Sequence, residues 1–426
     1  MILPSNGKIV IIDDVFEDVK PLMKALSQEG MPFLFFKDQG GDDLPVNGPI
    51  EDIRLVFLDL DLGIGGLSPK ENIRYVQERL YKIIKPNTPY VLVIWSTHDE
   101  GVYKQTLLED FETHFSDYKP IAYCSLEKAT LLSLEASEVV STIRIKLKES
   151  LKKFEAFNAF LLWESIVSKS SGEIVNGFTN IFEIDDSWDN NLKAFFYRLA
   201  KANVGLEKVK LIDDSEKLKI ALETITSALS DSIEKNIVSE IHKLPLEIKE
   251  VNSNITNDHL ISINTKLHFI NSELFAHFHP GNLYIREFND DKMIEGIVTG
   301  SFNKNIVEEV LKSKIHTIQV DVTPICDYSQ DKKYTRVLSG VLIHQKYWEN
   351  KKSSTGIFIY DLCPIVNIMG DNYFPIFDFR FFKSLKQEIV QEVFPSPNYR
   401  IRSQLLIDLQ AGLSNHINRP GIVSVI

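Results

Sequence analysis

The sequence predicts an α/β protein, with an N-terminal five-stranded, doubly wound parallel sheet, a helical middle region and an α+β C-terminal domain. Three observations predict this class. Over the first ~130 residues, short apolar runs alternate with helix-length segments, the pattern typical of a parallel sheet. From about residue 131 to 243, long stretches keep apolar residues at helical spacing. After about residue 251, short strands separated by polar turns predominate, with helices near the end.

The N-terminal region contains five runs of mainly apolar residues, each of strand length. Three of the four connections between them have helical spacing, and the connection after the second strand is instead rich in Gly, Asp and Pro. The expected strands are KIVIIDD (8–14), MPFLFFKD (31–38), RLVFLD (from 54), YVLVIWSTHDE (90–100) and PIAYCSLEKA (120–129). The expected helices are 18–30, 71–85 and about 101–115.

The middle region is expected to be helical throughout. One amphipathic helix of roughly six turns or more is predicted over 137–167, and a second over 215–244, with a capped helix start near 183–192. The first of these helices offers a packing surface or a homodimer interface. In the C-terminal region the expected strands are 283–288, 316–328, 335–344 and 355–366, and the expected helices are 381–394 and 402–417. The predicted domains are therefore 1–132, 133–250 and 251–426.

Composition narrows the functional classes. The 426 residues are 44% hydrophobic and 25% charged, which is ordinary for a globular protein. The net charge of −12 argues against a broad grip on nucleic acid, although it leaves room for a local basic patch. No signal peptide and no run of about 20 apolar residues is present, so we expect a cytoplasmic protein without a membrane span. Three distant cysteines indicate neither disulfides nor a zinc site.

Polar residues follow several of the predicted strands at the point where each strand ends. Ligands of an open parallel sheet bind at the carboxyl edge of its strands, so these residues are expected to converge there. They are Asp13 and Asp14 after the first strand, Asp59 after the third, Ser96 with Thr97 after the fourth, and a lysine after the fifth. Three converging carboxylates repel one another unless a divalent cation neutralises them, and Mg²⁺ suits such a site.

This arrangement resembles the receiver domain of two-component response regulators, over roughly residues 7–130. The resemblance implies that Asp59 is phosphorylated by a histidine kinase, with Mg²⁺ held by Asp13, Asp14, Asp59 and the backbone carbonyl of Asp61. It also gives Ser96 the role of the hydroxyl that responds to the phosphoryl group. A metal ion would both orient the phosphoryl group and offset its charge.

The receiver lysine is assigned to Lys128, which follows the fifth apolar run. Receivers usually carry Lys-Pro there, whereas this chain has Lys128-Ala129, and its Lys119-Pro120 pair precedes the run. The position three before Lys128, usually an aromatic switch residue, is Ser125, and Tyr123 is the nearby substitute.

Two motifs outside this region contain residue types that can form sites. His277 and His279 alternate and could share a metal if Cys326 or His344 supplied a third ligand, but histidines beside a turn more often make ordinary hydrogen bonds. Cys326, expected at a strand end before Asp327, could be a nucleophile only with a histidine partner. A buried cysteine is the default interpretation.

The C-terminal region contains no recognisable output motif. The whole chain more loosely resembles the intermediate regulators of Detocs-type phage-defence systems, in which such a protein can act as a phosphate sink. That resemblance implies a partner histidine kinase and a second receiver or effector protein. Two alternatives stay open: a receiver-controlled effector enzyme with a catalytic C-terminal domain, and a pseudo-receiver that only binds proteins.

Overall fold

The computed structural model describes most of the chain. The described residues are 9–38, 43–59, 69–96, 101–244, 246–250, 253–271, 275–286, 290–329 and 333–418. Contacts divide the chain into two compact units, Met1–Asp185 with Ile225–Lys249, and Asp186–Thr224 with Glu250–Ile426. The domain boundaries predicted from the sequence stay predictions. Within the described residues, no helix combines the length and apolar character needed to cross a membrane.

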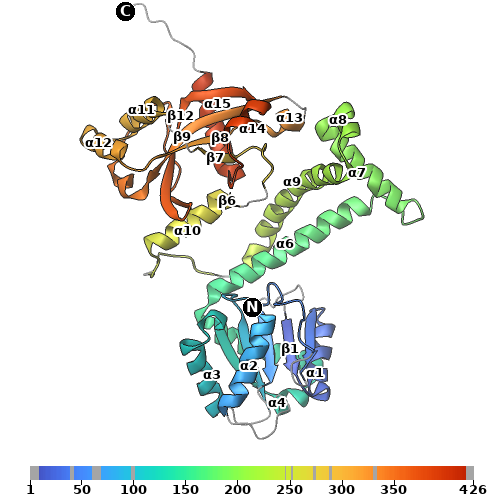
Figure 1. The fold of residues 1–426 in the computed structure, drawn as a ribbon. Helices are drawn as coiled ribbons and strands as arrows, with labels where there is room; N and C mark the ends of the chain where they lie inside the picture. Colours follow the sequence, from blue (N-terminus) through green and yellow to red (C-terminus); the bar gives the residue numbers. More distant parts are fainter. Residues whose placement is uncertain are drawn as a thin grey trace, which may run out of the picture. The chain divides into compact units, whose positions relative to one another are not determined.

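The first unit contains a five-stranded parallel sheet in the order β2-β1-β3-β4-β5, which confirms the predicted N-terminal architecture (Figure 1). The order 2-1-3-4-5 belongs to the flavodoxin-like doubly wound folds. Its strands are β1 (Ile9–Asp13), β2 (Phe33–Lys37), β3 (Leu55–Asp59), β4 (Val91–Ser96) and β5 (Ala122–Glu127). The helices around them are α1 (Phe16–Gln28), α2 (Pro69–Ile83), α3 (Gly101–Thr113), α4 (Lys128–Leu132) and α5 (Ala136–Ser150).

Alternate residues of the central strands enter two separate cores, one on each face of the sheet. Ile9 and Ile11 of β1 pack with residues of α1 and α5, and Val10 and Ile12 pack with residues of α2 and α3. Every residue of β1 and of β3 is buried. A strand covered on both faces is apolar without alternation, which explains why these two strands could be predicted from the sequence as continuous apolar runs.

The long helix predicted over 137–167 is broken, and that part of the prediction is wrong. α5 ends at Ser150, a 3₁₀ turn covers Leu151–Lys153, and α6 (Glu155–Thr179) follows. Phe154 has φ −126° and ψ 38°, outside the helical region. Leu151 and Phe157, on either side of the break, both enter the core formed by β1, α1 and α5. Tertiary packing therefore bends a sequence whose apolar spacing is continuous.

The remaining helices of the middle region are α7 (Trp188–Val204), α8 (Leu206–Leu211) and α9 (Asp214–Glu240), followed by a 3₁₀ turn at Ile241–Lys243. In the first unit, α6 and the end of α9 are joined by a polar contact. Asn236 is buried and donates to Ser170 Oγ at 2.9 Å and to Glu173 Oε2 at 3.2 Å. The expectation of a helical middle region is confirmed.

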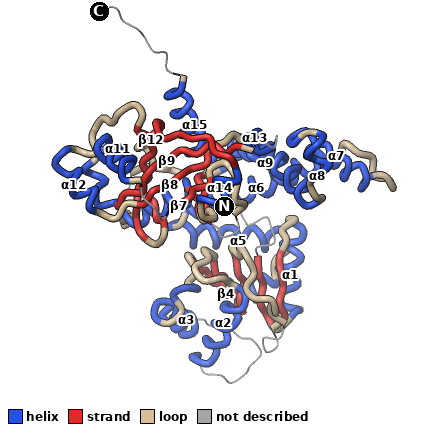
Figure 2. Tube along the Cα trace, turned by 45° about the horizontal axis from the view of Figure 1, so that its top comes forward, coloured by secondary structure: helices blue, strands red, loops and turns tan. Residues whose placement is uncertain are grey.

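The second unit is built on an eight-stranded sheet in the order β10-β12-β9-β8-β7-β13-β6, with β11 paired to β12, and all of its pairings are antiparallel (Figure 2). Its strands are β6 (Phe269–Asn271), β7 (Asn282–Arg286), β8 (His316–Asp321), β9 (Tyr334–His344), β10 (Ile359–Tyr360), β11 (Val366–Ile368), β12 (Asp371–Lys386) and β13 (Tyr399–Ile401). Its helices are α10 (Asn257–His268), α11 (Asp291–Ser301), α12 (Lys304–Lys312), α13 (Ile325–Ser329), α14 (Gln387–Val393) and α15 (Ser403–Ile417). The α+β expectation is confirmed.

Three local predictions in this unit are wrong. The single strand expected over 355–366 contains only the two-residue β10 and the first residue of β11, with 361–365 outside any strand, because β10 and β11 pair with separate parts of β12. The strand expected over 316–328 ends at Asp321, so Cys326 lies in α13 instead of at a strand end. The helix expected over 381–394 begins only at Gln387, because residues up to Lys386 belong to β12. β12 pairs with β9 on both sides of a register shift between Phe377 and Phe382, and this long-range pairing overrides the local helical spacing.

Asp321 ends β8 in a fully buried position of this unit. Its Oδ1 accepts a hydrogen bond from the Thr323 backbone N–H at 2.9 Å, and its Oδ2 accepts one from the Tyr328 hydroxyl. Burial nevertheless raises its pKa from 3.8 to about 6, because the neighbouring donors only partly replace water. The folded state therefore binds this proton more tightly than the unfolded state does.

Asp321 is expected to make the second unit less stable as the pH rises from about 4 to about 6, with no further change above. The shift corresponds to about 3 kcal/mol in the free energy of unfolding. Asp321→Asn, which keeps both hydrogen-bonding positions, should remove this loss. Denaturant unfolding of both proteins at pH 4.5 and pH 7 measures the difference, with exposed Asp291→Asn as the matched control. Equal pH dependence in wild type and Asp321→Asn would contradict the prediction.

Candidate functional site

The candidate site lies at the carboxyl edge of the parallel sheet. β1 and β3 are neighbours there, and the strand order reverses at this pair, which is where doubly wound sheets form a crevice. Asp13 is the last residue of β1 and Asp59 the last of β3. The parallel register of these two strands brings their ends to the same edge, as the sequence predicts.

Three carboxylates meet at this edge. Asp13, Asp14 and Asp59 each offer an oxygen, and these oxygens lie within 4.8 Å of one another. Asp13 and Asp59 are buried and Asp14 is half-buried. The Val15 backbone N–H donates to Asp13 Oδ1 at 2.8 Å, which orients that carboxylate at the start of α1. This oxygen-only donor set suits a hard divalent cation such as Mg²⁺, which takes one or two carboxylates and keeps several waters.

Lys128 supplies the positive charge of the site. Its Nζ lies 2.8 Å from Asp13 Oδ2 and donates to Asp59 Oδ2 at 2.6 Å. Lys128 is the first residue of α4, directly after β5, and is 2% exposed. Lys119 instead lies before β5 and pairs with Glu112 on the surface, away from the carboxylates. The structure therefore brings Lys128, and not Lys119, to the carboxylates.

Burial and ion pairing act in opposite directions on these groups. For Asp13, burial is the largest influence and raises the pKa, while Lys128 and the Val15 N–H lower it less. For Lys128, burial lowers the pKa, but the hydrogen bonds and attraction from Asp13 and Asp59 together outweigh it, so the pKa is raised. One ammonium shared among clustered carboxylates leaves a negative site that a further cation would neutralise.

The other predicted site residues are placed only in part. Ser96 ends β4 and pairs in register with Glu127 of β5, so its backbone reaches the same edge, but its side chain lies outside what the structure describes. Asp61 and Thr97 lie outside the described residues. Tyr123, the substitute for the aromatic switch residue, is 40% exposed on β5.

Sequence reasoning missed two charged contacts of this unit. Asp18 lies in the first turn of α1, and its Oδ2 is 3.6 Å from Lys128 Nζ. Its position one helical turn after Asp14 could have indicated that it faces the same site. A second ion pair joins Arg79 of α2 to Asp38, just after β2, and both side chains are almost fully buried. No local pattern connects these two residues, which are 41 positions apart.

The histidine and cysteine candidates do not form a site in the described part of the chain. The carboxylate cluster is the only described group of three metal-type ligands, and it contains no histidine. His279 Nδ1 contacts the Pro280 carbonyl oxygen at 2.7 Å, and His344 Nδ1 accepts from the Lys346 backbone N–H. The side chain of Cys326 lies outside what the structure describes.

Comparisons with known proteins add little to this geometry. No protein-family model matches the chain, and no curated protein matches it. Among solved structures, a crystal structure of full-length FixJ from B. japonicum aligns with 13% sequence identity over 55% of this chain and 97% of that chain, with a TM-score of 0.21. A TM-score this low carries no argument, so the fold of the first unit rests on its own sheet order and strand register.

Proposed function

We propose that the first unit is a receiver-type phosphoacceptor, in which Asp59 takes a phosphoryl group from a phosphohistidine of a partner kinase. The observation that carries the proposal is the position of Lys128, whose ammonium bridges Asp59 and Asp13 at the switch point of a 2-1-3-4-5 sheet. A buried carboxylate at such an edge, next to one cation and two more acids, has the charge pattern that phosphoryl transfer needs.

The residues have distinct roles in this proposal. An oxygen of Asp59 attacks phosphorus, so the new O–P bond forms as the P–N bond of phosphohistidine breaks, and the released imidazole nitrogen takes up a proton from water. Lys128 pairs with the phosphoryl oxygens as a point charge. Asp13 and Asp14, with Asp59, would hold Mg²⁺, which supplies charge neutralisation when bound. The Ser96 hydroxyl and the Asp61 carbonyl complete the proposed set.

Labelling the full chain with ³²P tests the proposal. The chain is incubated with acetyl phosphate, or with a phosphorylated histidine kinase, in the presence of Mg²⁺. Wild type should acquire an alkali-labile, hydroxylamine-sensitive label, as expected of an acyl phosphate, and Asp59→Asn should acquire less than about 1% of it because the amide is not a nucleophile. Asp117→Asn, which removes an exposed acid of the same unit, is the control.

Full labelling of Asp59→Asn would show that Asp59 is not the phosphoacceptor. If wild type binds neither Mg²⁺ nor the phosphoryl mimic BeF₃⁻, the unit acts as a pseudo-receiver that only binds partners. The finer role, an intermediate or phosphate sink in an anti-phage system, is part of the proposal and rests on the sequence resemblance alone. It predicts that adding this chain lowers the label reaching a second receiver protein supplied by the same kinase.

A further inference from the structure

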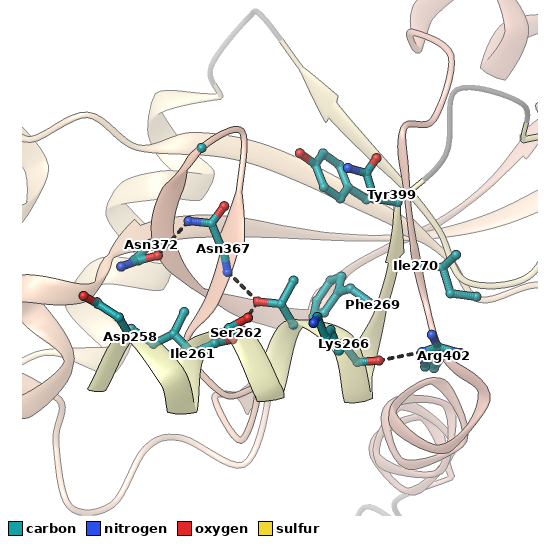
Figure 3. Close-up of a pocket in the computed structure, with 13 residues that line it drawn as sticks. Asp258, Ile261, Ser262, Lys266, Phe269, Ile270, Asn367, Asn372, Tyr399 and Arg402 are labelled. Carbon is teal, nitrogen blue, oxygen red and sulfur yellow. Dashed lines mark hydrogen bonds between the residues drawn. The ribbon is translucent and has the colours of Figure 1, made fainter. Parts of the chain in front are cut away.

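Two cavities of the second unit lie on one face of its sheet, on either side of Tyr399. The first, about 850 Å³, is lined by α10, β6, the β11–β12 turn and β13 (Figure 3). The second, about 650 Å³, is lined by β7, the start of β8, Met369 and residues just before β13. In the sheet, Tyr399 stands opposite Asn271 of the first cavity and Leu283 of the second. Directly opposed residues point to the same face, so the two cavities are neighbours on that face and share Tyr399 as a lining residue; together they are called the groove.

Tyr399 and the β11–β12 turn form the divider of this groove. The Tyr399 hydroxyl accepts a hydrogen bond from the Met369 backbone N–H at 2.8 Å. Met369 and Gly370 both have positive φ, 56° and 78°, which makes the turn tight. Tyr399 is partly exposed and lines both cavities, so its ring is available to a ligand on either side.

The groove is cationic within a protein of net charge −12. Lys266 and Arg402 line the first cavity, where the Arg402 Nε donates to the Lys266 backbone oxygen at 3.0 Å, so the two side chains start side by side. Arg286 and Lys314 line the second cavity. None of these four side chains forms an ion pair with another described residue. Asp258 is the sole acid among the described residues that line the two cavities.

Amide side chains supply much of the remaining polar lining. Asn367 Nδ2 donates to Asn372 Oδ1 at 2.9 Å, and the Asn367 backbone N–H donates to Thr265 Oγ1 at 2.7 Å, which fixes this wall of the first cavity (Figure 3). Asn271 lines the first cavity and Asn398 the second. Amides both donate and accept, as the edges of nucleobases do.

We propose that this groove binds a phosphodiester-linked nucleotide ligand. Cations in each half hold phosphate groups, the Tyr399 ring stacks on a base, and the asparagines contact base edges. Cations line both halves, and a ligand that contacts both sets must extend past Tyr399, which favours at least two linked nucleotides. The shared chemistry covers a free dinucleotide and a short single strand, and the test separates them.

Fluorescence polarisation of the full chain with 5′-fluorescein-labelled ten-nucleotide single strands of DNA and of RNA tests the proposal. Wild type should bind at least one strand, with an affinity that falls as salt rises from 50 to 200 mM. Lys266→Gln/Lys314→Gln, which removes one exposed cation from each half, should weaken binding at least about tenfold. Lys292→Gln/Lys304→Gln makes the same charge change at exposed positions outside the groove and should bind within about twofold of wild type.

Tyr399 gives a second, charge-independent readout. Tyr399→Phe keeps the ring and should bind nearly as well as wild type, whereas Tyr399→Leu should lose at least about fivefold. Melting curves of each variant check that it is folded. Displacement of the strand by unlabelled pApA identifies a dinucleotide-sized ligand, and failure to displace it identifies a longer strand. No binding at 100 µM protein, equal loss in both lysine pairs, or equal competition by a poly-glutamate peptide would overturn the proposal.

Discussion

Lys128→Met is expected to lower the free energy of unfolding of the first unit by about 3–5 kcal/mol without Mg²⁺, and to tighten Mg²⁺ binding more than tenfold. The Lys128 ammonium is the counter-charge that Asp13 and Asp59 share, at 2.8 and 2.6 Å from their oxygens. Removing it leaves buried carboxylates whose charges repel one another. The same carboxylates then attract a divalent cation without competition from the ammonium.

Calorimetric melting of the full chain with and without Mg²⁺ measures both effects at once. The melting transition of the first unit should fall in metal-free Lys128→Met and should recover more in Mg²⁺ than the wild-type transition does, by mass action. Lys119→Met is the matched control, because Lys119 is a half-exposed lysine that precedes β5 and pairs on the surface. Unchanged metal-free stability, or weaker Mg²⁺ binding, would show that Lys128 is not the counter-charge of the cluster.

The first sheet could be predicted because its central strands β1 and β3 are covered on both faces. Residues 9–12 and 55–58 are continuous apolar runs, as expected of strands that are buried on both faces. The acids at their ends followed from the rule that parallel strands end at one edge. Lys128 was found by the same rule, since it follows the fifth run, whereas a motif-based choice would have selected the Lys119-Pro120 pair.

Features determined by long-range packing could not be predicted from local sequence patterns. The apolar spacing of 137–167 is continuous, yet the chain bends at Phe154 because both neighbouring segments enter one core. Residues 381–386 have helical spacing, yet they pair with β9. The groove around Tyr399 is lined by α10, the β11–β12 turn and the strands β6, β7, β8 and β13, most of which are distant from one another in sequence, so no local signal marks it.

The ion pair between Asp38 and Arg79 is the clearest case of a contact that no sequence pattern predicts. Breaking it is expected to have the second large effect, a loss of stability. Asp38 is fully buried and Arg79 is 2% exposed. Arg79 Nε donates to Asp38 Oδ2, Arg79 Nη2 donates to Asp38 Oδ1 at 3.3 Å, and Nη1 donates to the Tyr75 carbonyl oxygen at 3.2 Å. The bidentate geometry ties the residue that follows β2 to the middle of α2.

Arg79→Leu is expected to lower the free energy of unfolding by about 3–5 kcal/mol, because it leaves the Asp38 carboxylate buried without the Arg79 guanidinium. The double variant Asp38→Val/Arg79→Leu should cost less than Arg79→Leu alone, since no charge then stays buried. Native-state hydrogen exchange of peptides from β2 and α2 measures these free energies within the two-unit chain. Lys85→Ala, which breaks the exposed pair with Glu51, should cost no more than about 0.5 kcal/mol.

The double variant shows whether the ion pair itself stabilises the unit. The connection between β2 and β3 contains no helix among its described residues, and the ion pair joins its first residue, Asp38, to α2. If the double variant costs as much as Arg79→Leu, the ion pair itself holds α2 in place, and hydrophobic residues of similar volume cannot substitute. If the double variant loses much less stability, the buried charges orient α2 but add little net stability. We expect this outcome, because desolvating two ions is costly.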